Sequence, residues 1–268
     1  MLGGMIEINL LELPQDRLLA MPETERVFLF GIAHIANEVN MLQKLFFWAS
    51  NAPKQPEILK EVHISQALML AKILAGKLHE FWKFMEKAYF KSRVSQLWES
   101  KFDDEAKIIL KDIKGYFSNS NCLNDVRNDF AFHYSIEMMK CGFEKVKQEE
   151  RWKIYLSDTV GNSYYYAADM VAHYAMLEKV SPGNHPKAIE KILDELNRIA
   201  YLVNEFAGQC WIVGVDLYLF PNDEKIHLVQ QNVKDRPRME DVEIPFFIQL
   251  PNKSLKRNGE KRIPPYGI

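Results

Sequence analysis

Apolar residues recur along most of this chain with the period of an α-helix. In residues 24–50, for example, Val27, Phe28, Ile32, Ile35, Val39 and Phe46 form a wide apolar stripe. A stripe of this kind faces the core of a helical protein. The pattern predicts helices over residues 24–50, 57–97, 103–116, 121–147, 168–180 and 186–219. Proline and polar runs interrupt it, notably at residues 51–56, 118–121 and 181–184.

The period changes to two in one internal segment. Trp152, Ile154 and Leu156 alternate with Lys153 and Tyr155, and residues 158–162 and 164–166 then resemble a turn and a second extended run. This alternation predicts a β-hairpin near residues 152–166. A second apolar segment, residues 240–250, predicts an edge strand or a segment that lies across the bundle, because Pro245 cannot donate a ladder hydrogen bond.

The order of these elements predicts an all-α fold with one main domain. We assign residues 1–220 to an antiparallel helical bundle with a small β-hairpin insertion, and residues 221–268 to a C-terminal extension. The content of hydrophobic residues, 47%, is ample for a buried core and excludes a disordered chain. No internal repeat with the period of a solenoid is present.

Charge and cysteine content narrow the functional classes. A formal net charge of −2 gives no overall basic field, so any contact with nucleic acid must come from a local patch. The three cysteines, Cys122, Cys141 and Cys210, have wide spacings that fit a reducing compartment and no zinc motif. No basic segment precedes an apolar run at the N-terminus, and no apolar stretch is long enough for a membrane span. We expect a cytoplasmic protein that does not associate with membranes.

One short run has the residue types that phosphodiester chemistry needs. Residues 127–133 read Arg-Asn-Asp-Phe-Ala-Phe-His. Histidine exchanges protons near neutral pH, whereas arginine stays charged and presents a planar fork of donors that suits phosphate. On a regular α-helix, six residues turn about 240° and rise about 9 Å, so Arg127 and His133 would not share one stripe, although a long arginine spans such a gap.

This run resembles the RN…H motif of the HEPN proteins, in which an arginine, a polar neighbour and a histidine lie within a helical bundle. The resemblance covers residues 24–147 well and the last helices loosely. It implies a homodimer whose two motifs meet in one cleft, and an endoribonuclease of toxin–antitoxin or phage-defence type that cuts RNA by attack of the 2′-hydroxyl without a metal or cofactor. Other members bind and do not cut. The alternative is therefore a non-catalytic scaffold that binds a partner protein, such as an antitoxin, or a nucleotide.

The resemblance assigns roles to five residues. Arg127 and His133 are the expected catalytic pair, in which Arg127 stabilises the phosphate and His133 acts as acid or base. We expect Asn128 to orient the substrate or the imidazole. Asp129 either holds the tautomer of the histidine or faces water. Tyr134 either contacts a base or phosphate or, more simply, packs its ring on the helix.

Other candidate groups have simpler interpretations. The pairs His34–Glu38 and Asp169–His173 have ligand-like helical spacing, but a bundle metal site needs further carboxylates, so we expect no metal site. His79 and Glu80 have no partner that the sequence identifies, and the default is a histidine that faces solvent or has a satisfied hydrogen bond. The tyrosines of residues 164–166 fit strand packing better than base stacking. A basic cluster in the extension, at Lys253, Lys256, Arg257, Lys261 and Arg262, fits a solvated tail better than an RNA clamp.

Overall fold

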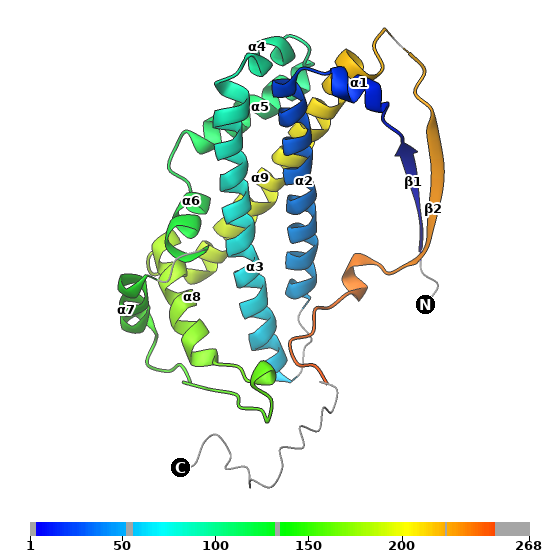
Figure 1. The fold of residues 1–268 in the computed structure, drawn as a ribbon. Helices are drawn as coiled ribbons and strands as arrows, with labels where there is room; N and C mark the ends of the chain where they lie inside the picture. The colour runs from blue at the N-terminus through cyan, green and yellow to red at the C-terminus, as the bar shows by residue number, and fades with distance from the viewer. Residues whose placement is uncertain (1–3, 52–55, 132–134, 223, 250–268) are drawn as a thin grey trace, which may run out of the picture.

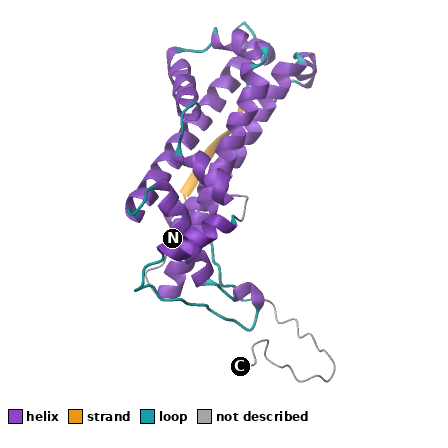
Figure 2. Cartoon of the chain, turned by 90° about the vertical axis from the view of Figure 1, so that its left-hand side faces the viewer, coloured by secondary structure: helices purple, strands orange, loops and turns teal. Residues whose placement is uncertain are grey.

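The computed structural model describes residues 4–51, 56–131, 135–222 and 224–249. Helices make up most of this part of the chain, and strand occurs only in one ribbon (Figure 2). The α-helices are α1 (Gln15–Ala20), α2 (Glu23–Ser50), α3 (Glu57–Phe84), α4 (Arg93–Glu99), α5 (Asp104–Phe117), α6 (Cys122–Val126), α7 (Ile136–Lys145), α8 (Tyr166–Val180) and α9 (His185–Gly214). Three of them continue into π-helical turns, η1 (Met85–Phe90) after α3, η2 (Arg127–Ala131) after α6 and η4 (Val215–Leu219) after α9.

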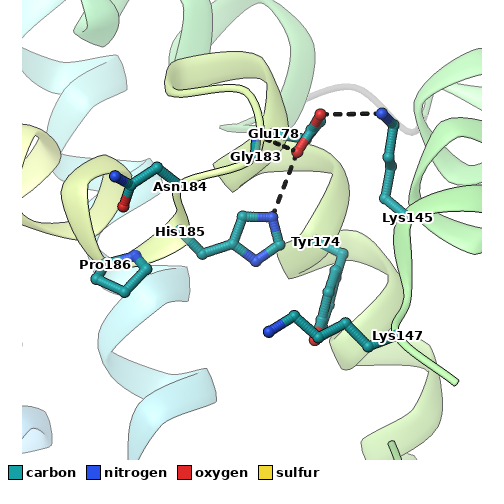
Figure 3. A pocket seen from close by; sticks show the side chains of 8 residues that line it. All are labelled: Lys145, Lys147, Tyr174, Glu178, Gly183, Asn184, His185 and Pro186. Carbon is teal, nitrogen blue, oxygen red and sulfur yellow. Dashed lines mark hydrogen bonds and ion pairs between the residues drawn. The ribbon is translucent and has the colours of Figure 1, made fainter. Parts of the chain in front are cut away.

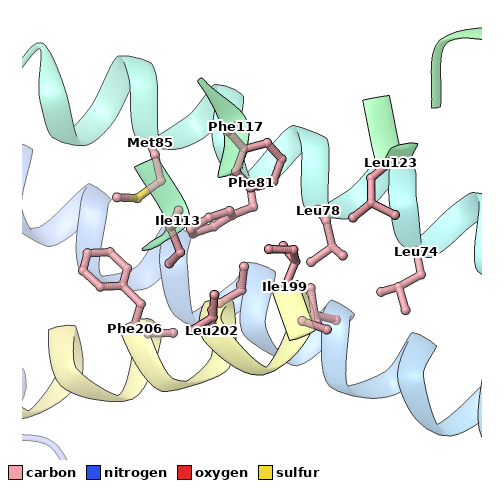
Figure 4. Close-up of a cluster of buried hydrophobic side chains, with 14 of the residues drawn as sticks. Leu74, Leu78, Phe81, Met85, Ile113, Phe117, Leu123, Ile199, Leu202 and Phe206 are labelled. Atoms are coloured by element: carbon pink, nitrogen blue, oxygen red, sulfur yellow. The ribbon is translucent and has the colours of Figure 1, made fainter. Parts of the chain in front are cut away.

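The long helices α2, α3 and α9 form the body of the molecule. Helices α2 and α3 run antiparallel, and α9 crosses behind both of them (Figure 1). Their apolar stripes meet α5 in a continuous core, which includes Leu78 and Phe81 of α3, Ile113 of α5, and Ile199 and Phe206 of α9 (Figure 4). Each of these five side chains is inaccessible to solvent. The fold is therefore held by the helical stripes that the sequence displays.

Side-chain caps fix where several helices begin. Asp103 accepts a hydrogen bond from the backbone N–H of Ala106 at 2.7 Å, and Asn184 accepts one from Lys187 at 3.1 Å. Such caps satisfy backbone donors that a helix leaves free at its first turn. The predicted helices at residues 24–50, 103–116, 168–180 and 186–219 are confirmed to within a few residues, with π-helical geometry at the end of the last one.

Two predicted helices are shorter than the pattern indicates. The helix expected over residues 57–97 ends at Phe90, because Ser92 caps the new helix α4 by accepting from the N–H of Val94. The helix expected over residues 121–147 consists of α6, η2 and the separate helix α7. Ser135 has an extended backbone and caps α7 by accepting from Met138 at 3.2 Å. A single straight helix through the motif was therefore wrong.

The strands are not where the alternating pattern placed them. Strand β1 (Gly4–Leu11) pairs antiparallel with β2 (Leu228–Arg236) in a two-stranded ribbon (Figure 1). Ribbon β1–β2 thus joins the N-terminal residues to the C-terminal extension. The expected strand at residues 240–250 was wrong for its described part, 240–249, which contains a short 3-10 turn (Met239–Asp241) and no strand.

The expected hairpin at residues 152–166 is reduced to one antiparallel bridge, between Tyr155 and Tyr164. Its arms are held to α3 by side chains. Lys153 contacts Glu61 at 2.6 Å, the hydroxyl of Tyr155 donates to Glu61 at 2.7 Å, and Tyr164 shares a hydrogen bond with Ser65. These hydrogen bonds attach residues 153–164 to α3 through their side chains. The segment therefore lies along the helix and does not form the longer β-hairpin that the alternation predicts.

Two asparagines attach the C-terminal segment to the bundle. The amide of Asn162 both donates to the carbonyl of Ile248 at 2.8 Å and accepts from its N–H at 3.1 Å. The amide of Asn51 lies 3.1 Å from the carbonyl oxygen of Val242. Residues 239–249 therefore lie across the bundle, one of the two arrangements expected for this segment. Among the described helices, none has the length and apolar character to cross a membrane.

Candidate functional site

The motif directly follows a short helix, α6, that packs against α3. Asn121 caps α6 by accepting from the backbone N–H of Asn124 at 2.9 Å. Cys122, Leu123 and Val126 of α6 are buried in the core, and this packing anchors the segment. The chain then continues as the π-helical turn η2, which begins at Arg127. A π-turn contains more residues than an α-turn, so the angular spacing expected for a regular α-helix does not apply here.

Two polar contacts connect this segment to α3. Nδ1 of His79 lies 2.8 Å from Oδ1 of Asn124. One residue further along α3, the carboxylate of Glu80 lies 3.4 Å from Nη2 of Arg127. Asn124 and Arg127 are three residues apart, and His79 and Glu80 are neighbours, so the two contacts lie side by side and join α3 to α6 and to η2.

The guanidinium of Arg127 is partly buried and only partly satisfied. Its side chain is 30% exposed, and that of Glu80 is 57% exposed. Nη1 donates to Oδ1 of Asn128 at 3.0 Å, whereas the buried Nε has no hydrogen-bond partner among the described residues. An exposed ion pair of this kind contributes only about 0–1 kcal/mol. The contact with Glu80 therefore contributes little to the stability of the fold.

The remaining predicted site residues divide into two groups. Asp129 lies 3.5 Å from Nζ of Lys179, which connects η2 to α8, so Asp129 has a cationic partner on a neighbouring helix. Asn128 contacts Arg127, its neighbour in sequence, and its role in orienting a substrate stays a prediction. His133 and Tyr134 lie outside the described residues, as does Phe132. Of the five predicted residues, the structure thus brings together Arg127 and Asn128.

Sequence reasoning missed the contributions of α3 and α8 to this site. No partner was named for His79 or Glu80, because nothing in the sequence identifies partners that lie 45 and 47 residues away. Neither Asn124 nor Lys179 was identified as a site residue. The one available signal was the dipeptide His79-Glu80 itself, a proton carrier beside a carboxylate in a long amphipathic helix.

A second polar cluster lies where α7, α8 and α9 meet. A cavity of 280 Å³ is lined there by residues that include Lys145, Lys147, Tyr174 and His185 (Figure 3). The carboxylate of Glu178 joins its walls by accepting from the N–H of Gly183 at 2.9 Å and pairing with Lys145 at 3.0 Å and His185 at 3.5 Å.

These contacts identify Glu178 as the internal anion of the cavity. The hydrogen bond from Gly183, followed by that from Lys145, lowers the pKa of Glu178. The carboxylate is therefore ionised at neutral pH and neutralises the charge of Lys145. We interpret this cavity as a charged junction that holds the ends of three helices together.

A histidine of α8, His173, lies in a third polar region, near Lys72 of α3. Burial lowers the pKa of His173 to about 4, and the positive charge of Lys72 on α3 acts in the same direction, against the opposing effect of Asp169. The pKa of Lys72 is also lowered by burial. His173 is thus neutral at pH 7. No cluster of three or more potential metal-ligating side chains occurs within the residues that the structure describes.

No known protein family, curated protein or solved structure matches this chain.

Proposed function

We propose that this chain is a metal-independent endoribonuclease that resembles the HEPN proteins. The observation that carries the proposal is the run of residues 127–133, whose first five residues form a π-turn with the fork of Arg127 held by one weak ion pair. Single π-turns inside helices are frequent at functional sites. Among the described residues, the buried Nε has no partner, and an arginine with a free donor beside an exposed carboxylate suits the binding of an anion.

In the proposed reaction, the 2′-hydroxyl of RNA attacks the adjacent phosphorus. A base removes the proton of the hydroxyl, the bond from phosphorus to the 5′ oxygen breaks, and an acid protonates that leaving oxygen. Arg127 stabilises the charge on the phosphate, and His133 transfers one of the two protons. The products are a 2′,3′-cyclic phosphate and a 5′-hydroxyl.

The active unit of this proposal is a homodimer with two motifs in one cleft. Such a contact is isologous, so the same residues appear on both sides of a two-fold axis. Sedimentation should give twice the 31.3 kDa mass of the chain at micromolar concentration. A monomer throughout that range would remove the composite site. Cytoplasmic expression without an inhibitory partner protein should also slow cell growth.

The enzymatic test is cleavage of single-stranded RNA in the presence of a chelator. Arg127→Ala removes the fork and should lower the single-turnover rate by about 10²- to 10³-fold, as loss of one electrostatic stabiliser does. Arg127→Lys keeps the charge and loses the fork. Partial activity of this variant supports a point-charge role, and full loss supports a two-pronged phosphate contact. The matched control is Arg198→Ala, on α9, which should cut RNA at the parent rate.

The competing function is a non-catalytic scaffold that binds a partner protein or a nucleotide. One observation favours it: Asn128 and Glu80 of the same chain already occupy two donors of Arg127. The two functions give different results in one experiment. If the parent protein binds a partner tightly and cuts no RNA, and if Arg127→Ala leaves its partner affinity unchanged, the chain is a scaffold.

A further inference from the structure

A buried carboxylate at the start of α2 lacks a hydrogen-bond partner on one of its two oxygens. Glu25 lies in the first turn of α2, and its side chain is only 1% exposed. Its Oε1 accepts a hydrogen bond from Nε of Arg93 at 3.1 Å, whereas its buried Oε2 has no partner among the described residues. Buried polar atoms in native proteins are nearly always hydrogen-bonded, so an oxygen of this kind points to a missing partner.

The residues around Glu25 explain why the fold itself does not supply that partner. A glutamate in the first turn of a helix commonly reaches back to the backbone N–H of the capping residue. The capping residue of α2 is Pro22, which has no backbone N–H. On the other side of the ion pair, Nη1 and Nη2 of Arg93 have no acceptor within the described part of the chain. Both members of the pair therefore keep hydrogen-bonding capacity for a ligand.

A cavity of 480 Å³ opens beside this pair, and its lining includes Glu25, Arg93, Leu97 and Tyr218. Helix α4, which contains Arg93 and Leu97, lies at the end of the bundle where α2 begins (Figure 1). Small-molecule sites typically have volumes of about 300–1,000 Å³. The cavity is therefore large enough for a small ligand that contacts both charged groups.

Two further residues complete the chemistry of this cavity. Tyr218 lies in η4, the π-helical turn that follows α9. Its burial, and then the negative charge of Glu25, raise the pKa of Tyr218, so its hydroxyl keeps a proton that it can donate at neutral pH. Leu97 is 41% exposed and provides an apolar surface. The cavity thus combines an anion, a cationic fork, a neutral donor and an apolar wall.

We infer that this cavity binds a free α-amino acid, whose ammonium group donates to Oε2 of Glu25 and whose carboxylate pairs with the Nη atoms of Arg93. In an α-amino acid both charged groups are attached to one carbon atom, and Glu25 and Arg93 are correspondingly adjacent. The planar fork of an arginine suits a carboxylate. Since the side chain of Arg93 is 68% exposed, it can shift to admit the ligand to the buried oxygen. This site does not depend on cleavage of RNA.

The test is calorimetric titration of the full-length protein with each of the standard α-amino acids. We expect at least one of them to bind with a dissociation constant below about 1 mM. Its N-acetyl derivative lacks the ammonium charge, and the corresponding amine lacks the carboxylate. Each of these analogues should bind at least about 10-fold more weakly, as expected for the loss of one charged hydrogen bond. An analogue that binds as tightly as the amino acid, or no binding of any amino acid at about 10 mM, would overturn the inference.

Two variants connect this binding to the pair. Glu25→Gln keeps the shape of the side chain but replaces the charged acceptor, and it should weaken binding by about 10- to 100-fold. Arg93→Lys, at an exposed position, keeps the charge but loses the fork, and it should weaken binding by about 3- to 10-fold. The matched control is Glu38→Gln, which changes a glutamate of α2 that pairs with Lys77 and does not line the cavity.

Thermal unfolding provides a second measurement on the same proteins. The bound amino acid should raise the melting temperature of the parent and of Glu38→Gln by the same amount, and that of Glu25→Gln by less, because only a ligand that binds the folded state stabilises it. If Glu25→Gln does not fold, the affinity of Arg93→Lys decides the question. Parent affinity in Arg93→Lys and in a folded Glu25→Gln would show that the amino acid binds elsewhere and would overturn the inference.

Discussion

The two long faces of α3 show how one helix serves both the fold and the candidate site. The face that includes Leu78 and Phe81 is excluded from solvent by α5 and α9. The other face meets α6 and η2 through the pairs His79–Asn124 and Glu80–Arg127, whose groups are partly exposed. The apolar face provides stability, whereas the polar face provides groups that can exchange a partner for a ligand. Changes on the two faces should therefore affect different properties.

The largest expected effect is on the apolar face. Phe81→Ala leaves a cavity among side chains of α5 and α9, and such changes cost about 3–5 kcal/mol of the free energy of unfolding. Denaturant unfolding monitored by circular dichroism measures this loss. A change below about 1 kcal/mol would show that the core collapses around the gap and that this face is less important than its burial indicates.

The second expected effect is a loss of stability at acid pH, caused by the buried His173. The pKa of His173 is lowered to about 4 in the folded protein from an ordinary value of 6.5. The folded state therefore binds this proton less well than the unfolded state, so stability is full above pH 6.5 and falls as pH decreases toward 4, by on the order of 3 kcal/mol.

The matched variant for this pH effect is His173→Gln. It cannot take up the proton, so its free energy of unfolding should change less between pH 7 and pH 4.5 than that of the parent. His34→Gln, at an exposed position on α2, should keep the pH dependence of the parent. An identical pH dependence in the parent and in His173→Gln would contradict the lowered pKa.

The third expected effect is a loss of stability when the close contact between α7 and α8 is disturbed. A Cβ atom added at Gly142 would lie 2.2 Å from the backbone carbonyl oxygen of Val171, so the two helices would have to separate. Gly142→Ala should therefore destabilise the protein by roughly 1–3 kcal/mol. At Gly115 in α5 an added Cβ meets nothing within 4 Å, and Gly115→Ala should raise stability by about 0.5–1 kcal/mol. Equal melting temperatures for the two variants would refute this packing.

The smallest effect on stability should come from the polar face. Glu80→Gln removes an exposed ion pair, and the free energy of unfolding should change by less than about 1 kcal/mol. The same variant removes the competitor for Arg127, so the KM for RNA should fall by about 2- to 5-fold, which corresponds to an energy of that size. A large loss of stability in Glu80→Gln would mean that the polar face also holds the fold.

The sequence predicts elements that depend on local pattern. The stripes of α2, α5, α8 and α9 are visible because their spacing is set by the helix alone. The cap at Ser135 was also readable, since serine before a helix start is a common cap, yet the apolar run across it suggested one helix. The β1–β2 pairing was not readable, because strands 217 residues apart at their paired ends, Leu11 and Leu228, give no local signal of each other.

The sequence predicts only those residues of the candidate site that are consecutive in the chain. The dipeptide Arg127-Asn128 was identified from the order of residues, and these two side chains are in contact. Glu80 and His79 come from a helix that the chain reaches much earlier, so only the packing of α3 against α6 and η2 brings them to Arg127. The π-turn was equally hidden, because its residues have no composition that distinguishes them from an α-helix.

We propose above that the motif beside the polar face of α3 cuts RNA. The most direct measurement is cleavage of a 5′-labelled single-stranded RNA by the purified parent and by His133→Ala, in the presence of a chelator, with identification of the product ends. We expect 2′,3′-cyclic phosphate ends for the parent and a rate lower by about 10²- to 10⁴-fold for the folded, dimeric His133→Ala variant. Equal rates for the two proteins, or no cleavage by the parent, would contradict it.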